Sequence, residues 1–220
     1  MGYRRQKAIA RQATQLQTLL AHSIAKTGSD ENIHPDNQRP IGTDWVWRPA
    51  VFGTNLPDSV CIPAFSPATL GRDLSLFHDC PLVQISLRQE YTAQPDRFAI
   101  RLETFAFQGS YMSMVLEVPP AICADLHVDH LIRLSVCLDT KQPVTLSARL
   151  NAVHGSDVAQ LQETLVAEGA CRVAEFDLLD IPLARHGVDR FWIDIFIDCP
   201  APSSLLLQEI SVMRCQRADI

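Results

Sequence analysis

The amino-acid sequence predicts a mainly β protein: an antiparallel two-sheet, jelly-roll-like β-sandwich preceded by one N-terminal α-helix. Strand-like alternation of apolar and polar residues recurs through the second half of the chain, between short turns. The recurring helices that an α/β fold needs between its strands are missing. The pattern divides the chain into a basic amphipathic helix at 1–26, a linker at 27–44 and a β-sandwich domain at 45–220.

The N-terminal segment has the composition of a helix. Residues 3–26 contain no Gly or Pro and are rich in Ala, Gln, Leu and Arg. Apolar residues recur at helical spacing in one stripe: Ile9, Ala13, Leu16, Leu20 and Ile24. Three interpretations of this stripe stay open. It packs on the rest of the chain, it packs on another copy or a partner, or it lies on an anionic surface. The partner-binding residues it predicts are Arg4, Arg5, Lys7, Arg11, Leu16 and Leu20.

The net charge of −6 conceals an uneven distribution. Five of the 19 basic residues and none of the 25 acidic residues lie in residues 1–26, which leaves a balance of −11 for the rest of the chain. Such an acidic body does not suit nucleic-acid binding, so no nucleic-acid partner is expected. A membrane surface and a homo-oligomer formed through the helix both stay open as partners. No apolar run approaches the roughly 18 residues of a membrane span.

The seven cysteines are scattered and odd in number. No continuous apolar segment follows the basic N-terminus, as it would in a secretory signal. The cysteines therefore predict reduced, mostly buried thiols in a cytoplasmic protein, with a peripheral position on an anionic surface left open. A disulfide framework or a zinc site is the alternative. No cofactor and no metal is predicted.

Several segments have strand-like alternation. Residues 45–81 contain frequent prolines that interrupt any long strand, and 155–166 is expected to be a loop or short helix. Gln108-Gly109-Ser110 is expected to be a hairpin turn. The predicted strands are Val83–Tyr91, Arg97–Phe107, Tyr111–Val118, His130–Leu138, Val144–Ala152, Arg172–Leu179, Arg190–Cys199 and Leu205–Arg214.

The two closing strands suggest a ligand site. On Arg190–Cys199, period-2 alternation puts Trp192, Asp194 and Asp198 on one face. An aromatic ring with carboxylates and nearby donors suits a sugar, whose ring stacks while its hydroxyls form hydrogen bonds. The donors and acceptors expected to complete the site are Arg149, Asn151 and His154. The competing interpretation puts Trp192 and Phe196 in the core, with the two aspartates capping strand edges.

An alternative site is His78-Asp79-Cys80, whose base and thiol are the groups of a nucleophilic enzyme. Neighbouring strand residues point to opposite faces, so Asp79 cannot share a face with the other two. The competing interpretation is a turn in which Asp79 caps backbone groups and His78 satisfies a hydrogen bond. His127-x-x-His130, near Asp125 and Asp129, has helical metal-site spacing but is expected to lie in an exposed turn.

Two stretches of sequence resemble known families. The run Phe191-Trp192-Ile193-Asp194, followed by Leu205 to Val212, is similar to the last strands of galactose-binding-like and carbohydrate-binding jelly rolls. Three further runs resemble an uncharacterised family of rhodobacter-type alphaproteobacteria, a domain of unknown function: Gly42-Thr43-Asp44-Trp45-Val46-Trp47-Arg48-Pro49, Leu76-Phe77-His78-Asp79-Cys80-Pro81 and Arg149-Leu150-Asn151-Ala152-Val153-His154-Gly155. This second resemblance implies a bacterial accessory role and no active site.

The sequence thus favours a non-catalytic binding module that recognises a glycan or a protein partner through one face of the sandwich. The alternative is a structural or assembly protein that docks into a larger envelope or phage-like complex through its N-terminal helix. A Cys/His enzyme built on residues 78–80 is the third hypothesis.

Overall fold

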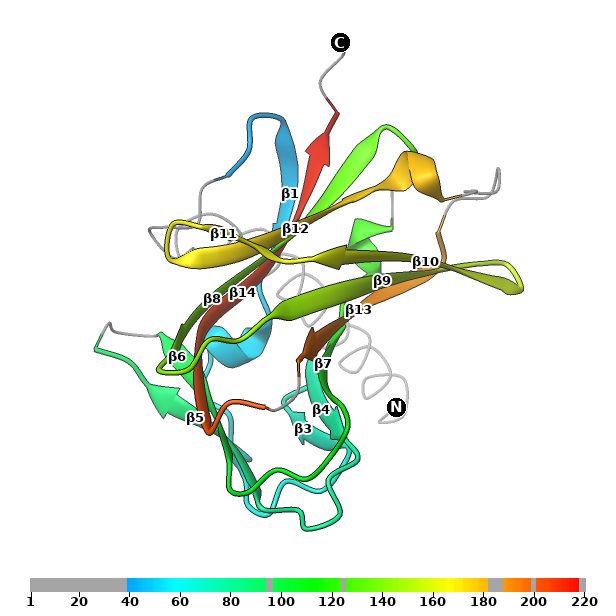
Figure 1. The fold of residues 1–220 in the computed structure, drawn as a ribbon. Coiled ribbons are helices and arrows are strands. Elements are labelled where there is room, and N and C mark those ends of the chain that lie inside the picture. Colours follow the sequence, from blue (N-terminus) through cyan, green and yellow to red (C-terminus); the bar gives the residue numbers. More distant parts are fainter. Residues whose placement is uncertain (1–38, 94–96, 124–125, 182–187, 199–200, 218–220) are drawn as a thin grey trace, which may run out of the picture. The chain divides into compact units, whose positions relative to one another are not determined.

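The computed structural model describes residues 39–93, 97–123, 126–181, 188–198 and 201–217. The predicted helix at 1–26 lies outside these residues, as do residues 27–38 of the predicted linker. The described residues form two antiparallel sheets packed face to face, which confirms the mainly β, two-sheet prediction (Figure 1). None of the helices in the described ranges has the length and apolar character needed to cross a membrane.

Sheet A is the larger of the two. Its strands run in the order β11-β12-β8-β14-β6-β5-β2, and β1 pairs with β14 beside this path. Their bounds are β1 (Thr43–Trp47), β2 (Val60–Cys61), β5 (Ile85–Tyr91), β6 (Phe98–Thr104), β8 (His130–Thr140), β11 (Val166–Glu168), β12 (Cys171–Asp177) and β14 (Ser204–Gln216).

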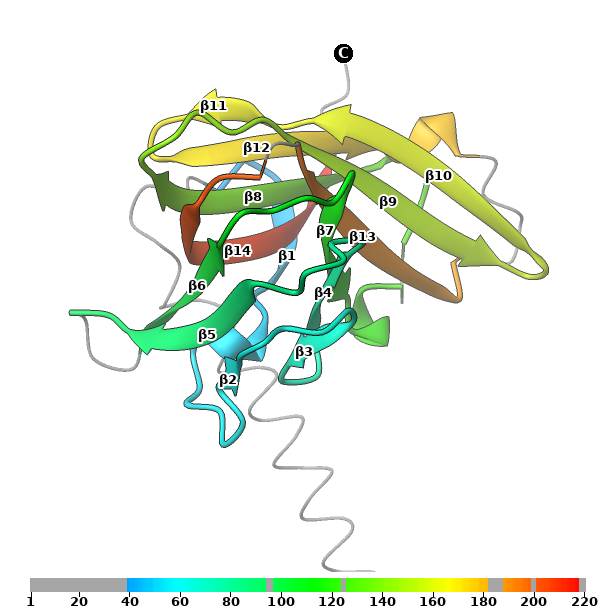
Figure 2. The ribbon, with the colours of Figure 1, turned by 60° about the horizontal axis from the view of Figure 1, so that its bottom comes forward.

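Sheet B has the order β10-β9-β13-β7-β4-β3 (Figure 2). Its strands are β3 (Ala68–Leu70), β4 (Leu74–His78), β7 (Met112–Glu117), β9 (Leu146–His154), β10 (Asp157–Thr164) and β13 (Arg190–Ile197). Short 3₁₀ turns lie between strands at Ala50–Phe52, Pro120–Ile122 and Leu178–Asp180.

The core lies between the sheets and follows the predicted alternation. Every second residue of β9 (Leu146, Ala148, Leu150) is buried against sheet A, and β13 and β8 contribute matching rows. Because side chains along a strand alternate between its faces, the remaining residues of β9 and β13 lie on the side of sheet B that points away from the core. This second side is called the outer face of sheet B below.

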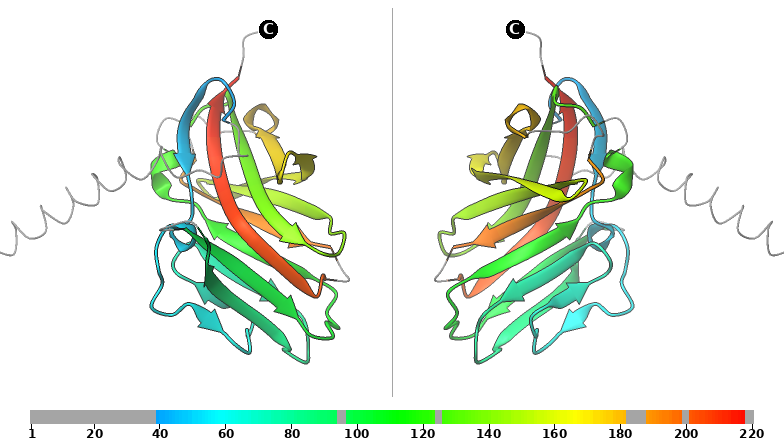
Figure 3. Two further views of the ribbon diagram at one scale, coloured as in Figure 1. Left: turned by 90° about the vertical axis from the view of Figure 1, so that its left-hand side faces the viewer. Right: turned by 90° about the vertical axis from the view of Figure 1, so that its right-hand side faces the viewer.

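The connections between the two sheets differ from the expectation. The predicted hairpin at Gln108-Gly109-Ser110 is wrong, because β6 pairs with β5 and β14 in sheet A while β7 pairs with β4 and β13 in sheet B. The closing strands likewise belong to different sheets: β13 lies between β9 and β7, and β14 lies beside β8 and β6 (Figure 3). Both sheets present the same alternation, so local pattern does not assign a strand to a sheet.

The expectation of a loop or short helix at 155–166 is also wrong. Gly155 adopts φ +62° in the turn that joins β9 to β10, a backbone conformation that favours glycine. The following residues, Asp157–Thr164, form β10 at the edge of sheet B, where most of them are exposed. An exposed edge strand needs little apolar alternation, which explains why the sequence pattern misses it.

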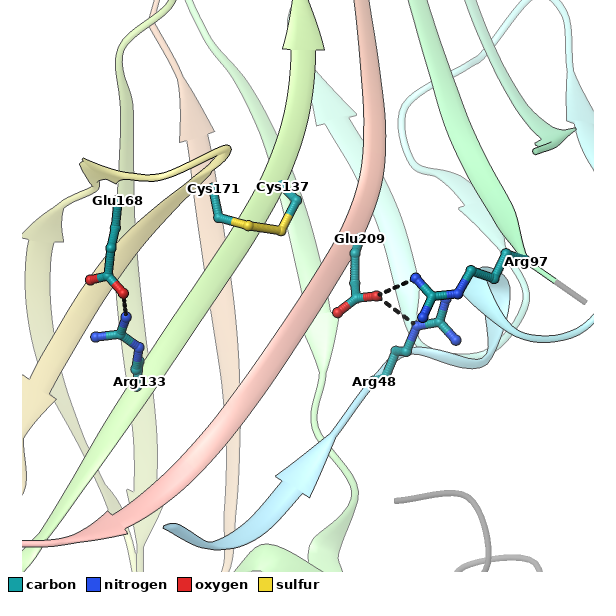
Figure 4. The surroundings of a disulfide bond; sticks show 7 residues. All are labelled: Arg48, Arg97, Arg133, Cys137, Glu168, Cys171 and Glu209. Carbon is teal, nitrogen blue, oxygen red and sulfur yellow. Dashed lines mark hydrogen bonds and ion pairs between the residues drawn. A yellow bond between two sulfur atoms is a disulfide. The ribbon is translucent and has the colours of Figure 1, made fainter. Parts of the chain in front are cut away.

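The prediction that all cysteines are reduced is wrong for two of them. Cys137 of β8 and Cys171 of β12 stand directly opposite one another in the sheet and form a disulfide (Figure 4). The bond closes a sequence separation of 34 residues. Cys61, Cys80, Cys123 and Cys215 are free thiols, and burial raises the pKa of Cys61, Cys123 and Cys215.

Candidate ligand-binding face

The outer face of sheet B brings several predicted site residues together. Cross-strand partners in antiparallel sheets point to the same side. The register puts Arg149 opposite Asp194, and Asn151 between Trp192 on one side and Gln160 on the other. The residues that form the candidate ligand face are Trp192, Asp194 and Phe196 of β13, Arg149 and Asn151 of β9, and Gln160 of β10.

A hydrogen-bond network centres on Asp194. Its Oδ2 accepts bonds from Arg149 Nε (3.1 Å) and Nη2 (2.8 Å) and from Asn151 Nδ2 (3.0 Å). Asn151 Oδ1 accepts a further bond from Gln160 Nε2 (2.8 Å). Asp194 is only 6% exposed and Asn151 1%. Asp194 and Asn151 are therefore buried beneath the surface, and their hydrogen bonds hold the more accessible side chains of Arg149 and Gln160 in place.

Two aromatic side chains lie on either side of this network. Trp192 and Phe196 are both half-buried, and they stand four residues apart on one strand, which corresponds to about 13 Å between Cα atoms. The guanidinium of Arg190 lies 5.2 Å from the Trp192 ring centroid, and that of Arg149 lies 5.1 Å from the Phe196 ring centroid. Such cation–π contacts orient the arginines over the rings.

The charges of the face are paired. Arg149 is bonded to Asp194, and Arg190 Nη2 donates to both carboxylate oxygens of Glu117 at 2.8 and 2.6 Å. These two arginines and two carboxylates balance each other. The face therefore offers hydrogen-bond donors, acceptors and aromatic surface without an excess of either sign, which suits an uncharged, hydroxyl-rich ligand better than a polyanion.

Two predicted site residues lie apart from the network. His154 follows Val153 at the end of β9, pairs with Asp157 and has the opposite side-chain parity from Asn151. Asp198 is exposed just beyond β13, where its backbone N–H donates to the carbonyl of Thr145 at 3.1 Å.

The sequence pattern missed other members of the face. The sequence does not indicate Gln160, because its strand β10 is mostly exposed and lacks a long apolar alternation. Arg190 and Glu117 lie beside the face, through a pairing of β13 with β7 that only the register reveals. Phe196, like Trp192, is half-buried on the outer face of sheet B and does not belong to the core, in contrast to the competing interpretation. An alternation of apolar residues and Gln in 159–162 is the signal that the sequence offers for β10.

His78, Asp79 and Cys80 are arranged as a turn. His78 Nδ1 accepts the backbone N–H of Cys80 (3.2 Å), so Nε2 carries the proton and donates to the carbonyl of Ala64 (2.8 Å). Asp79 accepts hydrogen bonds from the hydroxyl and backbone N–H of Ser110 and from the backbone of Tyr111. These bonds, the Ser110 hydroxyl first, hold the pKa of Asp79 below its usual value. Both ring nitrogens of His78 are therefore engaged with backbone groups.

Gly109 gives a test of this turn. A Cβ at residue 109 would lie 2.4 Å from Asp79 Oδ1, 2.6 Å from Phe107 Cζ and 3.0 Å from the Cys80 nitrogen. We expect Gly109→Ala to displace the Asp79 carboxylate and to lower the free energy of unfolding by about 1–3 kcal/mol, as overpacking does. Urea unfolding measures this. An unchanged midpoint would show that the turn relaxes without cost.

The remaining sequence candidates have other placements. His127 is exposed, and its backbone N–H donates to His130 Nδ1 at 2.9 Å. Burial and the nearby Arg214 lower the pKa of His130. The described residues hold no cluster of three or more side chains suited to a metal ion. The predicted partner-binding residues between Arg4 and Leu20 lie outside the described ranges.

The solved structures that match this chain include carbohydrate-binding modules and a tailspike protein of bacteriophage CBA120. One is the C-terminal family 22 carbohydrate-binding module of Clostridium thermocellum Xyn10B, at 9% identity and a TM-score of 0.40 over 83% of this chain and 99% of that one. Another is the family 11 module of Clostridium thermocellum, at 9% identity and a TM-score of 0.37 over 68% and 93%.

A third match is a two-module xylanase fragment, also of Clostridium thermocellum, at 10% identity and a TM-score of 0.40 over 65% of this chain; the chain spans only 29% of its length. No curated protein matches the chain. A family model does match, over residues 2–220. The chain therefore belongs to that family, which is described as a family of unknown function (DUF6478).

Proposed function

We propose that this protein is a non-catalytic binding module and that the candidate ligand face of sheet B binds a glycan. The observation that carries the proposal is the row Trp192, Asp194 and Phe196 on β13, with Arg149 and Gln160 held beside it by buried hydrogen bonds. Aromatic rings support the apolar faces of sugars, and preorganised donors and acceptors bind the hydroxyls.

The contacts distribute the roles within this face. Trp192 and Phe196 offer ring surface, while Arg149 and Gln160 offer donors at the surface. Asp194 and Asn151 are positioning residues, because their side chains are buried and engaged with Arg149 and Gln160. The arrangement extends across three neighbouring strands, so the proposed ligand is an oligosaccharide that crosses them rather than a single sugar in a deep pocket.

Removal of the Trp192 ring tests the proposal. We expect Trp192→Ala to weaken glycan binding by about tenfold or more, since one aromatic stacking contact contributes about 0.5–1.5 kcal/mol beyond its buried area. Calorimetry and affinity electrophoresis against a panel of neutral polysaccharides measure the effect. Trp192→Phe, which keeps a ring, is expected to retain most of the affinity.

The matched control is Phe65→Ala. Phe65 is an aromatic residue between β2 and β3 that is 64% exposed, so its removal disturbs little packing and leaves the candidate ligand face intact. Equal losses in Trp192→Ala and Phe65→Ala, or the absence of binding to every polysaccharide, would contradict the proposal. Recognition of a protein partner and assembly through the N-terminal helix stay predictions, tested by deletion of residues 1–26.

A further inference from the structure

A separate cavity lies on sheet A, on the side that points away from the core. It has a volume of about 410 Å³ and is lined by residues of β5, β6 and β14 and by Thr92, Ala93 and Arg97, which lie between β5 and β6 in the sequence. Glu90 and Ala99 are cross-strand partners there, and so are Arg101 and Leu206. None of its lining residues belongs to the candidate ligand face of sheet B.

Two arginines line this cavity, and neighbouring carboxylates hold them in place. Arg101 donates to Glu90 Oε2 through Nε and Nη2, both at 3.2 Å, and to the Ser204 hydroxyl through Nη1 at 3.3 Å. Arg97 Nη1 lies 3.8 Å from a carboxylate oxygen of Glu209, a residue with no exposed surface. A guanidinium that is fixed in this way loses little conformational entropy when it binds a ligand.

The acceptors of the cavity are already engaged. Glu90 is its acidic lining residue, and its two oxygens accept three bonds, one from Arg88 and two from Arg101. These bonds keep the pKa of Glu90 below its usual value although burial opposes the shift. The lining thus offers guanidinium donors, together with the amide of Gln208 and the hydroxyl of Tyr91, which can donate or accept. A complementary ligand must supply acceptors, and an anion supplies them best.

The lining also has an apolar part. Ala99 is nearly fully buried and Leu206 half-buried, and together they give the cavity a hydrocarbon surface beside the two arginines. The volume is near the lower end of the range of about 300–1,000 Å³ that is typical of small-molecule sites. A bare inorganic ion would leave this apolar surface without a contact.

We propose that this cavity binds a small anionic ligand of about the size of one sugar ring. Its carboxylate or phosphate group bonds Arg101 and Arg97, and its carbon skeleton packs on Ala99 and Leu206. This second site goes beyond the proposed glycan face, since it lies on the other sheet and selects for charge.

The test is calorimetry on the full chain with glucuronate, glucose 6-phosphate, glucose and inorganic phosphate. We expect at least one anionic sugar to bind more tightly than glucose by about tenfold or more, because a hydrogen bond to a charged group contributes about 1.5–3 kcal/mol. Comparison of glucuronate with glucose 6-phosphate distinguishes the carboxylate from the phosphate. Equal affinity for glucose, equal affinity for inorganic phosphate, or no binding of either anionic sugar would overturn the proposal.

Variants locate the binding. Arg101→Gln is expected to lose about tenfold or more in affinity. The matched control is Arg88→Gln, because Arg88 also bonds Glu90 but does not line the cavity. Gln208→Glu places a carboxylate in the lining and is expected to weaken binding even if Arg101→Gln fails to fold. Wild-type affinity in Gln208→Glu would count against the site.

The two proposed sites can be tested separately. Trp192→Ala is expected to bind the anionic sugar with wild-type affinity, so loss of glycan binding at sheet B and loss of anion binding at sheet A are distinguishable.

Discussion

Replacement of Glu209 by glutamine is expected to lower the free energy of unfolding by about 3–5 kcal/mol, the cost of breaking a buried ion pair from one side. Glu209 has no exposed surface, and its Oε2 lies 3.4 Å from Arg48 Nε and 3.8 Å from Arg97 Nη1 (Figure 4). Arg48 is itself largely buried, and its burial lowers its pKa while Glu209 opposes that shift. Without the carboxylate, two guanidinium groups would remain close together.

The position of Glu209 depends on a bulge in β14. The register of β14 against β8 shifts between Leu207 and Glu209, so Gln208 is an extra residue and Glu209 stands opposite Cys137. Without that extra residue, Glu209 would continue the buried apolar row of Leu205 and Leu207. Urea unfolding of Glu209→Gln measures the predicted loss.

The control for Glu209 is Glu117→Gln. Glu117 forms an ion pair with Arg190 in which both side chains are about half exposed, so its loss is expected to cost at most about 1 kcal/mol. Similar effects of the two substitutions would contradict the assignment of Glu209 as a buried charge that the fold depends on.

Removal of the Cys137–Cys171 disulfide is expected to cost about 3–4 kcal/mol. The bond spans 34 residues of sequence, and a loop of this length restricts the unfolded chain by about that amount in the chain-entropy description. Both cysteines are buried, at 0% and 3% exposure, so serine in their place adds a cost of polar burial and alanine is the better replacement. Unfolding of the Cys137→Ala/Cys171→Ala double variant measures the loss.

The control for the disulfide is Cys61→Ala, which removes a half-buried free thiol and is expected to change stability little. A reductant should destabilise the wild-type protein and leave the double variant unchanged. An equal response of both proteins would contradict the bond. Disulfides persist in oxidising compartments, so the thiol state of these two cysteines in protein taken directly from cells also tests the predicted cytoplasmic location.

The sequence predicts strands well where one face is buried. In β8, β9 and β13 the alternation of apolar residues coincides with the core, because each of these strands contributes every second side chain to it. It does not predict β10, whose residues are mostly exposed. It also does not predict β1, β2, β3 and β4, which lie in or next to the proline-containing residues 45–81. Partner choice is not a local property, so the alternation in β13 and β14 does not reveal that these strands belong to different sheets.

The candidate ligand face was partly predictable for the same reason. Trp192 and Asp194 share a face by alternation alone, and Arg149 and Asn151 share one on β9. That these two faces adjoin follows from the register of β9 with β13, which the sequence does not reveal. The burial of Asp194 and Asn151 beneath Arg149 and Gln160 is a tertiary property, and it changes their role from ligand contacts to positioning residues.

The most direct test of the glycan face is a nuclear magnetic resonance titration with neutral oligosaccharides, namely cello-, xylo-, manno- and maltohexaose. The indole N–H of Trp192 reports on the face itself, while Trp45 and Trp47 of β1 report on sheet A. We expect the Trp192 indole and the amides of β9 and β13 to shift with at least one oligosaccharide, while the indoles of Trp45 and Trp47 stay unchanged. Shifts confined to sheet A, or no shift with any of the four, would contradict the account.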